Sequence, residues 1–195
     1  MSDTGLEGGF TNAATESAAI FRAALNAMAR PGVIETVVGA GSGILPPKPL
    51  SAAAGAVLLT LADHETPLHL AGAHDCAAVR QWLAFHTGAR FVGRDQAVFA
   101  VGRWDDLIPL ADYRIGSAEF PDLSVTLIAE CDALSTHGVV MRGPGIEHVA
   151  ELNLPDPGFL DFNEARYPLG IDMILTAGSA LAAVPRSTRR ADQEG

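Results

Sequence analysis

The sequence almost lacks lysine. Lys48 is its only lysine, and the other twelve of its 13 basic residues are arginines. An enzyme that uses pyridoxal phosphate needs a lysine to form the Schiff base, but Lys48 lies in "PPKP", a proline-rich loop. This inventory argues against pyridoxal-phosphate chemistry, and we expect no cofactor.

Cysteine is scarce as well, because the chain contains only Cys76 and Cys131, with no CxxC spacing. Two isolated cysteines indicate small buried side chains in a reducing compartment, so we expect a cytoplasmic location. The stretch "HETPLH" (64–69) is not an HExxH motif, since its second histidine stands one residue too far along and Pro67 breaks the helix. We predict no metal site.

Long apolar runs are missing too. The longest ones end well short of the roughly 20 residues needed to span a bilayer, and residues 1–10 have neither the basic nor the apolar region of a signal peptide. We therefore expect no membrane association. The formal net charge of −10 would repel a nucleic-acid backbone, so we expect no nucleic-acid partner.

Helical and strand patterns alternate along the chain. Apolar spacing predicts a helix from Asn12 that Pro31 and Gly32 end, Ser51 can cap a second helix through about Leu61, and Asp75 can cap a third that ends at Gly88, with a later helix at 157–167. Apolar and β-branched runs predict strands at 33–38, 66–72, 97–102, 123–131 and 138–141.

These elements predict an α/β fold. A single domain over residues 11–188 would contain a mixed sheet flanked by helices. Residues 1–10 are small, polar and glycine-rich, which predicts a disordered N-terminus, and residues 189–195 are expected to form a flexible tail.

The apolar stretch 165–188 contains one acid, Asp172, and ends near Arg186. Alanine content favours a helix for 171–184, whereas Gly-Ser between two apolar arms favours a hairpin. We predict the hairpin. Burying Asp172 without a partner would be costly, so we expect a structural ion pair between Asp172 and Arg186, with phosphate binding by Arg186 as the alternative.

Other arginines are candidates for binding an anion. "RGPGI" (142–146) follows a predicted strand, and amides in its Pro-Gly turn could face an anion; a plain tight turn is the alternative. Arg22 and Arg30 have no acidic residue three or four positions away, so each needs a tertiary partner or a ligand. The candidate phosphate- or nucleotide-binding residues are Arg22, Arg30, Arg142, Gly145 and Arg186. No residue is a candidate for direct catalysis.

Four stretches together resemble the PhnH family, the H subunit of the bacterial carbon–phosphorus (C–P) lyase core complex. They are "FRAALNAMARPG" (21–32), "EFPDLSVTL" (119–127), "RGPGI" (142–146) and "YPLGIDMILTAGSALAAVPRST" (167–188). They occur in the family's order and at suitable spacing across most of the chain. The departures are Ala29, where the family often has serine, and Ser187, where threonine is usual.

The resemblance implies a fold similar to the large domain of pyridoxal-phosphate-dependent transferases, without the cofactor. It also implies a homodimer in isolation and assembly with the G, I and J subunits. The family's complex makes α-D-ribose 1-methylphosphonate 5-triphosphate from ATP and methylphosphonate during alkylphosphonate catabolism. The resemblance assigns the H subunit no chemical role.

Two hypotheses remain open at this stage. The chain could be a structural subunit that dimerises and docks through an apolar surface, part of a transferase complex but not catalytic alone. Alternatively, its arginines could contribute to a composite site that handles the triphosphate or the phosphonate.

Overall fold

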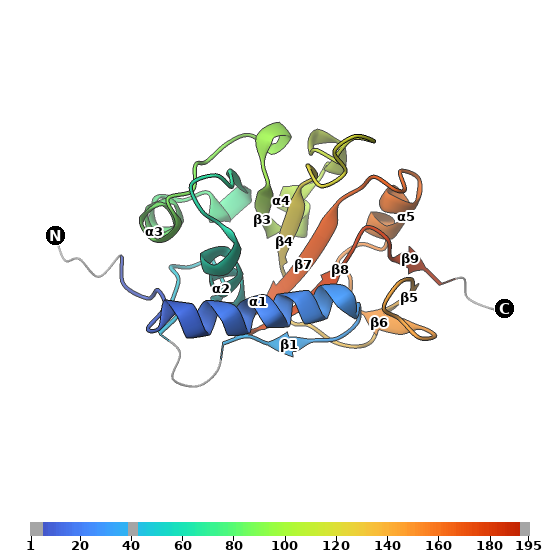
Figure 1. Ribbon diagram of the computed structural model, residues 1–195, viewed down its shortest axis with the longest axis horizontal. Coiled ribbons are helices and arrows are strands. Elements are labelled where there is room, and N and C mark those ends of the chain that lie inside the picture. Colours follow the sequence, from blue (N-terminus) through green and yellow to red (C-terminus); the bar gives the residue numbers. More distant parts are fainter. Residues whose placement is uncertain (1–5, 39–42, 192–195) are drawn as a thin grey trace.

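The computed structural model describes residues 6–38 and 43–191. A six-stranded mixed sheet runs through the molecule (Figure 1) in the order β1-β8-β7-β4-β3-β2. Four neighbouring strands are parallel, β8 is antiparallel to them, and β1 pairs antiparallel with β8. The parallel strands are β2 (Leu68–Leu70), β3 (Phe99–Arg103), β4 (Thr126–Glu130) and β7 (Asp172–Ala177), followed at one edge by β8 (Ala180–Val184) and β1 (Glu35–Thr36). The predicted α/β class with a mixed sheet is confirmed.

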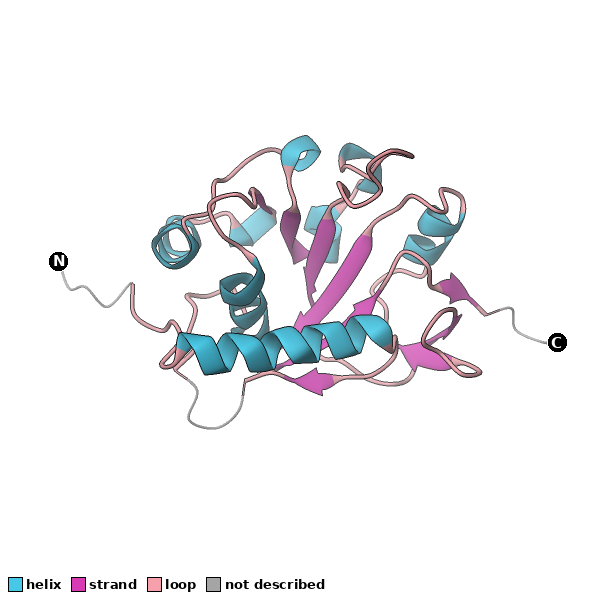
Figure 2. Ribbon diagram, in the orientation of Figure 1, coloured by secondary structure: helices cyan, strands magenta, loops and turns pink. Residues whose placement is uncertain are grey.

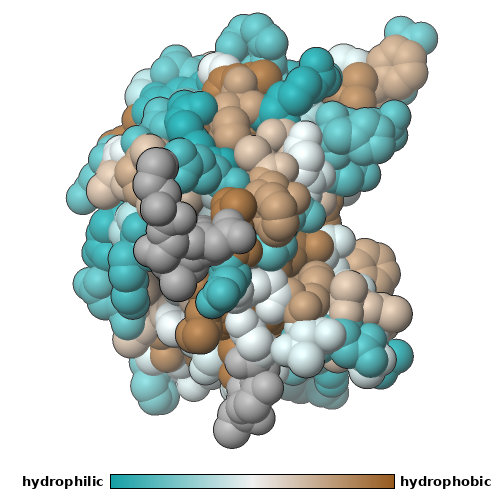
Figure 3. Space-filling view, turned by 90° about the vertical axis from the view of Figure 1, so that its left-hand side faces the viewer, coloured by the Kyte–Doolittle hydropathy of each residue, from teal (hydrophilic) through white to brown (hydrophobic). Residues whose placement is uncertain are grey.

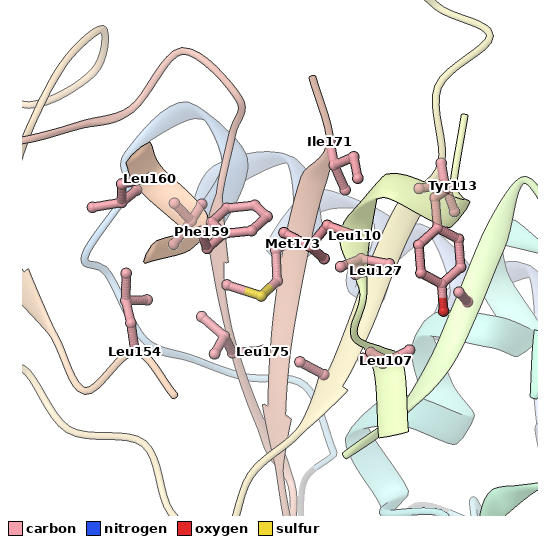
Figure 4. Packing of buried hydrophobic residues seen from close by; sticks show 14 of the residues in the cluster. Leu107, Leu110, Tyr113, Leu127, Leu154, Phe159, Leu160, Ile171, Met173 and Leu175 are labelled. Atoms are coloured by element: carbon pink, nitrogen blue, oxygen red, sulfur yellow. The ribbon is translucent and has the colours of Figure 1, made fainter. Parts of the chain in front are cut away.

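Helices cover both faces of this sheet (Figure 2) because alternate strand residues point to opposite sides. Ile174 packs with α1 (Ala13–Ala29), α2 (Ala52–Leu61) and α3 (Ala77–Thr87). Its neighbours Met173 and Leu175 pack on the other face with α4 (Trp104–Leu107) and α5 (Gly158–Glu164), as Figure 4 shows for Phe159 and Leu107. Both faces of the central strands are therefore buried.

A second, three-stranded antiparallel sheet was not predicted. It has the order β6-β5-β9, from β5 (Val139–Arg142), β6 (Ala150–Leu152) and β9 (Arg189–Arg190). Arg189 and Arg190 were predicted to lie in the tail 189–195, but they pair with Arg142 and Met141 of β5. The structured part thus continues past residue 188, because the backbone N–H and C=O groups of β5 pair with those of β9. Residues 192–195 lie outside the described residues.

The N-terminal segment also differs from the prediction of disorder over residues 1–10. The backbone oxygens of Leu6 and Glu7 accept hydrogen bonds from His86 (2.9 Å) and Trp82 (3.0 Å) of α3. These contacts hold Leu6 and Glu7 against α3, whereas residues 1–5 lie outside the described part. Sequence could not reveal them, since they join segments 75 or more residues apart.

Local signals place the helix ends correctly in most cases. Asn12 caps α1, and Glu16 accepts a hydrogen bond from the Asn12 amide at 2.6 Å, a reciprocal arrangement similar to a capping box. Ser51 caps α2 as predicted, and Gly88 ends α3 in the left-handed region. The prediction for α3 was wrong by one residue at its start.

The N-terminal error at α3 has a simple cause. Cys76 occupies the N-cap position without a side-chain hydrogen bond, because the carboxylate of Asp75 binds the Arg80 guanidinium instead. The strand predicted at 33–38 is also shorter than expected, since only Glu35 and Thr36 pair with β8.

The predicted hairpin in 171–184 is confirmed. β7 and β8 pair antiparallel, with Met173 opposite Val184 and Ala177 opposite Ala180. Gly178 makes the turn at a positive φ of 56°. Because Met173 faces Val184, the hairpin brings Asp172 and Arg186 to the same end.

Candidate functional site

The stretches quoted from the sequence meet at one corner of the molecule. The turn 143–146 packs against the end of α1, where a Cβ atom on Gly145 would lie 1.9 Å from the Ala29 carbonyl oxygen. The same turn approaches Ser187, whose carbonyl oxygen would lie 3.1 Å from a Cβ on Gly143. Segments near residues 30, 145 and 187 therefore form one packed unit.

Arg186 is held by its own chain. Its guanidinium and backbone amide both donate to the Asp172 carboxylate, at 2.5 Å from Nη2 and 2.8 Å from the amide. The guanidinium also donates to the Pro121 carbonyl oxygen and the Ser124 hydroxyl. Both members of the ion pair have less than a fifth of their side-chain surface exposed. Asp172, Pro121 and Ser124 therefore supply protein partners for the Arg186 guanidinium.

The other candidate arginines are on the surface. Arg30 lies at the end of α1 and donates to the Asn26 amide oxygen. Arg142 ends β5, and both Arg30 and Arg142 border the turn that contains Gly145. Arg22 lies about 12 Å earlier along α1, since eight residues rise by about 1.5 Å each. The backbone contacts of Gly145 and Gly143 thus bring Arg30 and Arg142 to one turn, whereas Arg22 lies farther along α1 and the Arg186 guanidinium is bound to Asp172.

A pocket that sequence reasoning missed lies at the carboxyl ends of β3 and β4. It has a volume of about 430 Å³, and its polar lining includes Arg103, Glu130, Cys131 and Asp132. Ligands of open α/β sheets commonly bind at this edge. The sequence did contain a signal for this pocket, because the predicted strands 97–102 and 123–131 are each followed by charged residues.

The charged groups of this pocket have partners within the chain. Arg103 donates to both oxygens of Asp132, at 2.9 and 3.2 Å, which raises the pKa of Arg103 and lowers that of Asp132. Glu130 is buried and accepts from the Ser51 amide (2.7 Å) and the Thr176 hydroxyl (3.1 Å). Glu130 therefore ties the start of α2 to the ends of β4 and β7.

A buried histidine stands beside Glu130. His74 Nε2 lies 3.9 Å from Glu130 Oε1, and neither ring nitrogen has a hydrogen-bond partner among the described residues. Burial lowers the pKa of His74 below its ordinary 6.5, and it outweighs the opposing attraction of the Glu130 and Asp106 carboxylates. Burial thus favours the neutral imidazole.

The pocket offers no activated nucleophile. Burial, together with the charge of Glu130, raises the pKa of the Cys131 thiol to about 11, which leaves little thiolate at neutral pH. Within residues 6–38 and 43–191, no three His, Cys, Asp or Glu side chains gather closely enough to hold a metal ion.

The outward face of α1 is unusually apolar. Nine residues of α1 are exposed, and Arg22 is the only charged one; seven are apolar: Ala13, Ala14, Ala18, Ala19, Phe21, Leu25 and Ala29. A surface helix normally presents polar residues to solvent. Elsewhere, as on the side shown in Figure 3, apolar residues are interspersed with hydrophilic ones, which is ordinary for a protein surface. No helix in the described part of the chain is long and apolar enough to cross a bilayer.

Comparison with known proteins gives matches that include all four of the quoted stretches. Residues 8–191 match the family described as "Bacterial phosphonate metabolism protein (PhnH)". The chain is 39% identical, over 93% of its length and 94% of the relative's, to "Alpha-D-ribose 1-methylphosphonate 5-triphosphate synthase subunit PhnH" of Rhizobium meliloti (strain 1021). It is 30% identical, over 86% of its length and 82% of the relative's, to "Putative C-P lyase subunit protein HtxG" of Stutzerimonas stutzeri. The chain belongs to the PhnH family of bacterial phosphonate metabolism proteins.

Proposed function

We propose that this chain is a subunit of the C–P lyase complex in alkylphosphonate catabolism. In that role it supports formation of α-D-ribose 1-methylphosphonate 5-triphosphate from ATP and methylphosphonate. Its relatives are named as subunits of that synthase and of a C–P lyase, and both alignments cover most of this chain. The proposal extends the role in those names to this protein.

Within the complex, we propose that the chain acts by docking and not by catalysis. The observation that carries this proposal is the apolar outward face of α1, where Phe21 and Leu25 are 47% and 53% exposed. Continuous apolar surface of this kind marks protein interaction sites. The pocket at the ends of β3 and β4 supports the same role, because Arg103 is paired with Asp132 and Glu130 accepts hydrogen bonds from Ser51 and Thr176.

The finer parts of the proposal follow from the family resemblance. The chain would assemble with the G, I and J subunits in the cytoplasm and form a homodimer when alone. Its sheet would resemble the large domain of pyridoxal-phosphate-dependent transferases, with no cofactor bound.

The test is reconstitution from purified subunits. We expect the chain to co-purify with the G, I and J subunits, and its omission to abolish triphosphate synthesis from ATP and methylphosphonate. Incubated alone with both substrates, the chain should release no adenine. Synthesis that proceeds undiminished without the chain, or turnover by the chain alone, would overturn the proposal.

A second candidate function is phosphate binding at the turn that contains Gly145. It is favoured by one observation, namely that Arg30 and Arg142 both border this turn. The test is calorimetry with ATP and with methylphosphonate. This candidate requires binding by the wild type that Arg142→Ala weakens by about tenfold or more, the value of one charge-assisted contact. Absence of binding by the wild-type chain would end it for the free subunit.

A further inference from the structure

We propose that the loop 117–123 is a contact surface for another subunit of the C–P lyase complex. The facing surface of that subunit would carry arginine or lysine side chains beside an apolar recess. The inference rests on the proposed function, since it requires that the chain enters the complex. It names one surface that makes the contact and states the chemistry of the partner.

The loop is held in one shape by hydrogen bonds within the chain. The amides of Ser117 and Leu123 donate to the Phe120 carbonyl oxygen, at 3.0 and 3.3 Å. The Phe120 amide donates to the Ser117 hydroxyl at 3.0 Å, and Arg186 donates to the Pro121 carbonyl oxygen at 2.8 Å. A loop that is already ordered loses little conformational entropy when it binds a partner.

The loop presents apolar side chains to solvent. All of its residues are exposed, and four of them are apolar, namely Ala118, Phe120, Pro121 and Leu123. Phe120 and Leu123 are 50% and 47% exposed. In Figure 1 the loop, drawn in yellow, lies at the upper margin of the molecule, before the start of β4. Aromatic side chains are enriched where proteins meet, so Phe120 is the natural anchor of such a contact.

A hollow opens at the base of the loop. It has a volume of about 220 Å³, and Ser117 and Leu123 line it together with Arg114, Ile115 and Gly116. The loop therefore combines a projecting ring with a recess that can receive a side chain of the partner. Interlocking of this kind gives the close packing found at the centre of protein interfaces.

Two carboxylates stand beside the apolar side chains. Glu119 precedes Phe120, Asp122 precedes Leu123, and both acidic residues are exposed. Within residues 6–38 and 43–191, neither carboxylate has an ion-pair partner. Charges at the rim of an interface favour a partner of opposite charge and speed its association. The surface that faces this loop is therefore expected to be basic.

A second copy of this chain fits the loop poorly. Two loops that met across a two-fold axis would bring Glu119 and Asp122 of both copies together. Like charges placed opposite one another disfavour association, and the chain as a whole already carries a formal net charge of −10. We therefore assign the loop to a different subunit.

The experiment measures binding of the full chain to the preassembled G, I and J subunits by biolayer interferometry. Phe120→Ala should weaken binding by about 30-fold or more, the loss typical of an interface anchor. The matched control is Phe85→Ala on α3, which is 63% exposed and lies outside the loop; it should bind as the wild type does. Circular dichroism confirms that both variants fold.

Charge reversal tests the chemistry of the partner. Glu119→Arg and Asp122→Arg should each weaken binding by about tenfold or more. The control Asp105→Arg changes the net charge by the same amount, but Asp105 follows β3 and so lies at the opposite edge of the parallel strands from the loop that precedes β4. It should bind as the wild type does. An equal loss for Asp105→Arg and Glu119→Arg would overturn the assignment of a basic partner.

Hydroxyl-radical footprinting of the wild-type chain tests the contact without any substitution. Oxidation of Phe120 and Leu123 should decrease when the G, I and J subunits bind, because both side chains become covered. Unchanged oxidation on binding would overturn the inference. So would loop variants that lose self-association but still bind the other subunits, because the occupant of the loop would then be a second copy.

Failure of this inference can be told apart from failure of the proposed function. A wild-type chain that does not bind the G, I and J subunits would overturn the proposed function. A wild-type chain that binds them, with Phe120→Ala and Glu119→Arg binding equally well, would overturn only the role of the loop.

Discussion

Gly145 lies so close to Ala29 that only a hydrogen atom fits on its Cα. A Cβ there would stand 1.9 Å from the Ala29 carbonyl oxygen, and the φ of Gly145 is +83°. This contact joins the end of α1 to the turn after β5. The stretches 21–32 and 142–146, which are separate in the sequence, therefore form one structural unit.

Gly145→Ala should therefore destabilise the fold by more than about 3 kcal/mol, because left-handed strain of about 1–3 kcal/mol adds to a backbone clash. The matched control is Gly178→Ala, since Gly178 has a φ of +56° and no atom within 4 Å of the position that a Cβ would take. That change should cost only about 1–2 kcal/mol. Urea unfolding measures both, and equal losses would contradict the contact.

Asp172→Ala should destabilise the fold by about 3 kcal/mol, because it leaves the largely buried Arg186 guanidinium without its carboxylate. Adding Arg186→Met should recover part of this loss, since the unpaired charge is removed. Asp75→Ala breaks the half-exposed pair with Arg80 and should cost less than about 1 kcal/mol. Thermal unfolding of the variants measures these losses of stability. Equal losses for Asp172→Ala and Asp75→Ala would refute the prediction.

Stability should fall as the pH drops below about 6.5, through His74. Because burial lowers its pKa in the folded chain, the unfolded chain binds more protons below pH 6.5. This contribution is present above that pH and is lost as the pH falls towards the folded-state pKa. In urea unfolding between about pH 7 and 5.5, His74→Gln should flatten the dependence. The exposed His137→Gln should behave as the wild type; identical curves for all three would exclude the effect.

Cys131 should resist alkylation at about pH 8. A pKa of about 11 instead of 9.0 lowers the thiolate fraction about 100-fold, and the thiolate is the reactive form. Peptide mass spectrometry after iodoacetamide treatment should show slow modification of Cys131 in the native chain and fast modification in urea. Similar rates in both conditions would contradict the burial of this thiol.

The helices and the hairpin could be predicted because their signals are local. Asn12 and Ser51 satisfy amides three residues away, and the Gly-Ser turn at 178–179 reverses a chain whose arms are both apolar. Such interactions span few residues, so they leave a readable pattern. The anchoring of Leu6 and Glu7 on α3 and the pairing of β9 with β5 join distant segments. No local pattern in the sequence predicts them.

The same distinction applies to the candidate site. The sequence indicated Arg30, Arg142 and Gly145 as motif residues, but only tertiary contacts bring them to one turn and pair Arg186 with Asp172. The polar pocket was missed because Arg103, Glu130 and its neighbour His74 lie far apart along the chain. They meet where parallel strands end.

By itself, the sequence determined the α/β class, the caps of α1 and α2, the β7–β8 hairpin and the family. Those properties depend on hydrophobic period, on capping side chains and on short motifs, all of which are written within a few residues. Only the tertiary structure decided that Arg186 is occupied by Asp172, that Glu130 is buried beside His74, and that one face of α1 stays uncovered. These outcomes depend on which distant segments approach one another, because burial and charge pairing are properties of the packed chain.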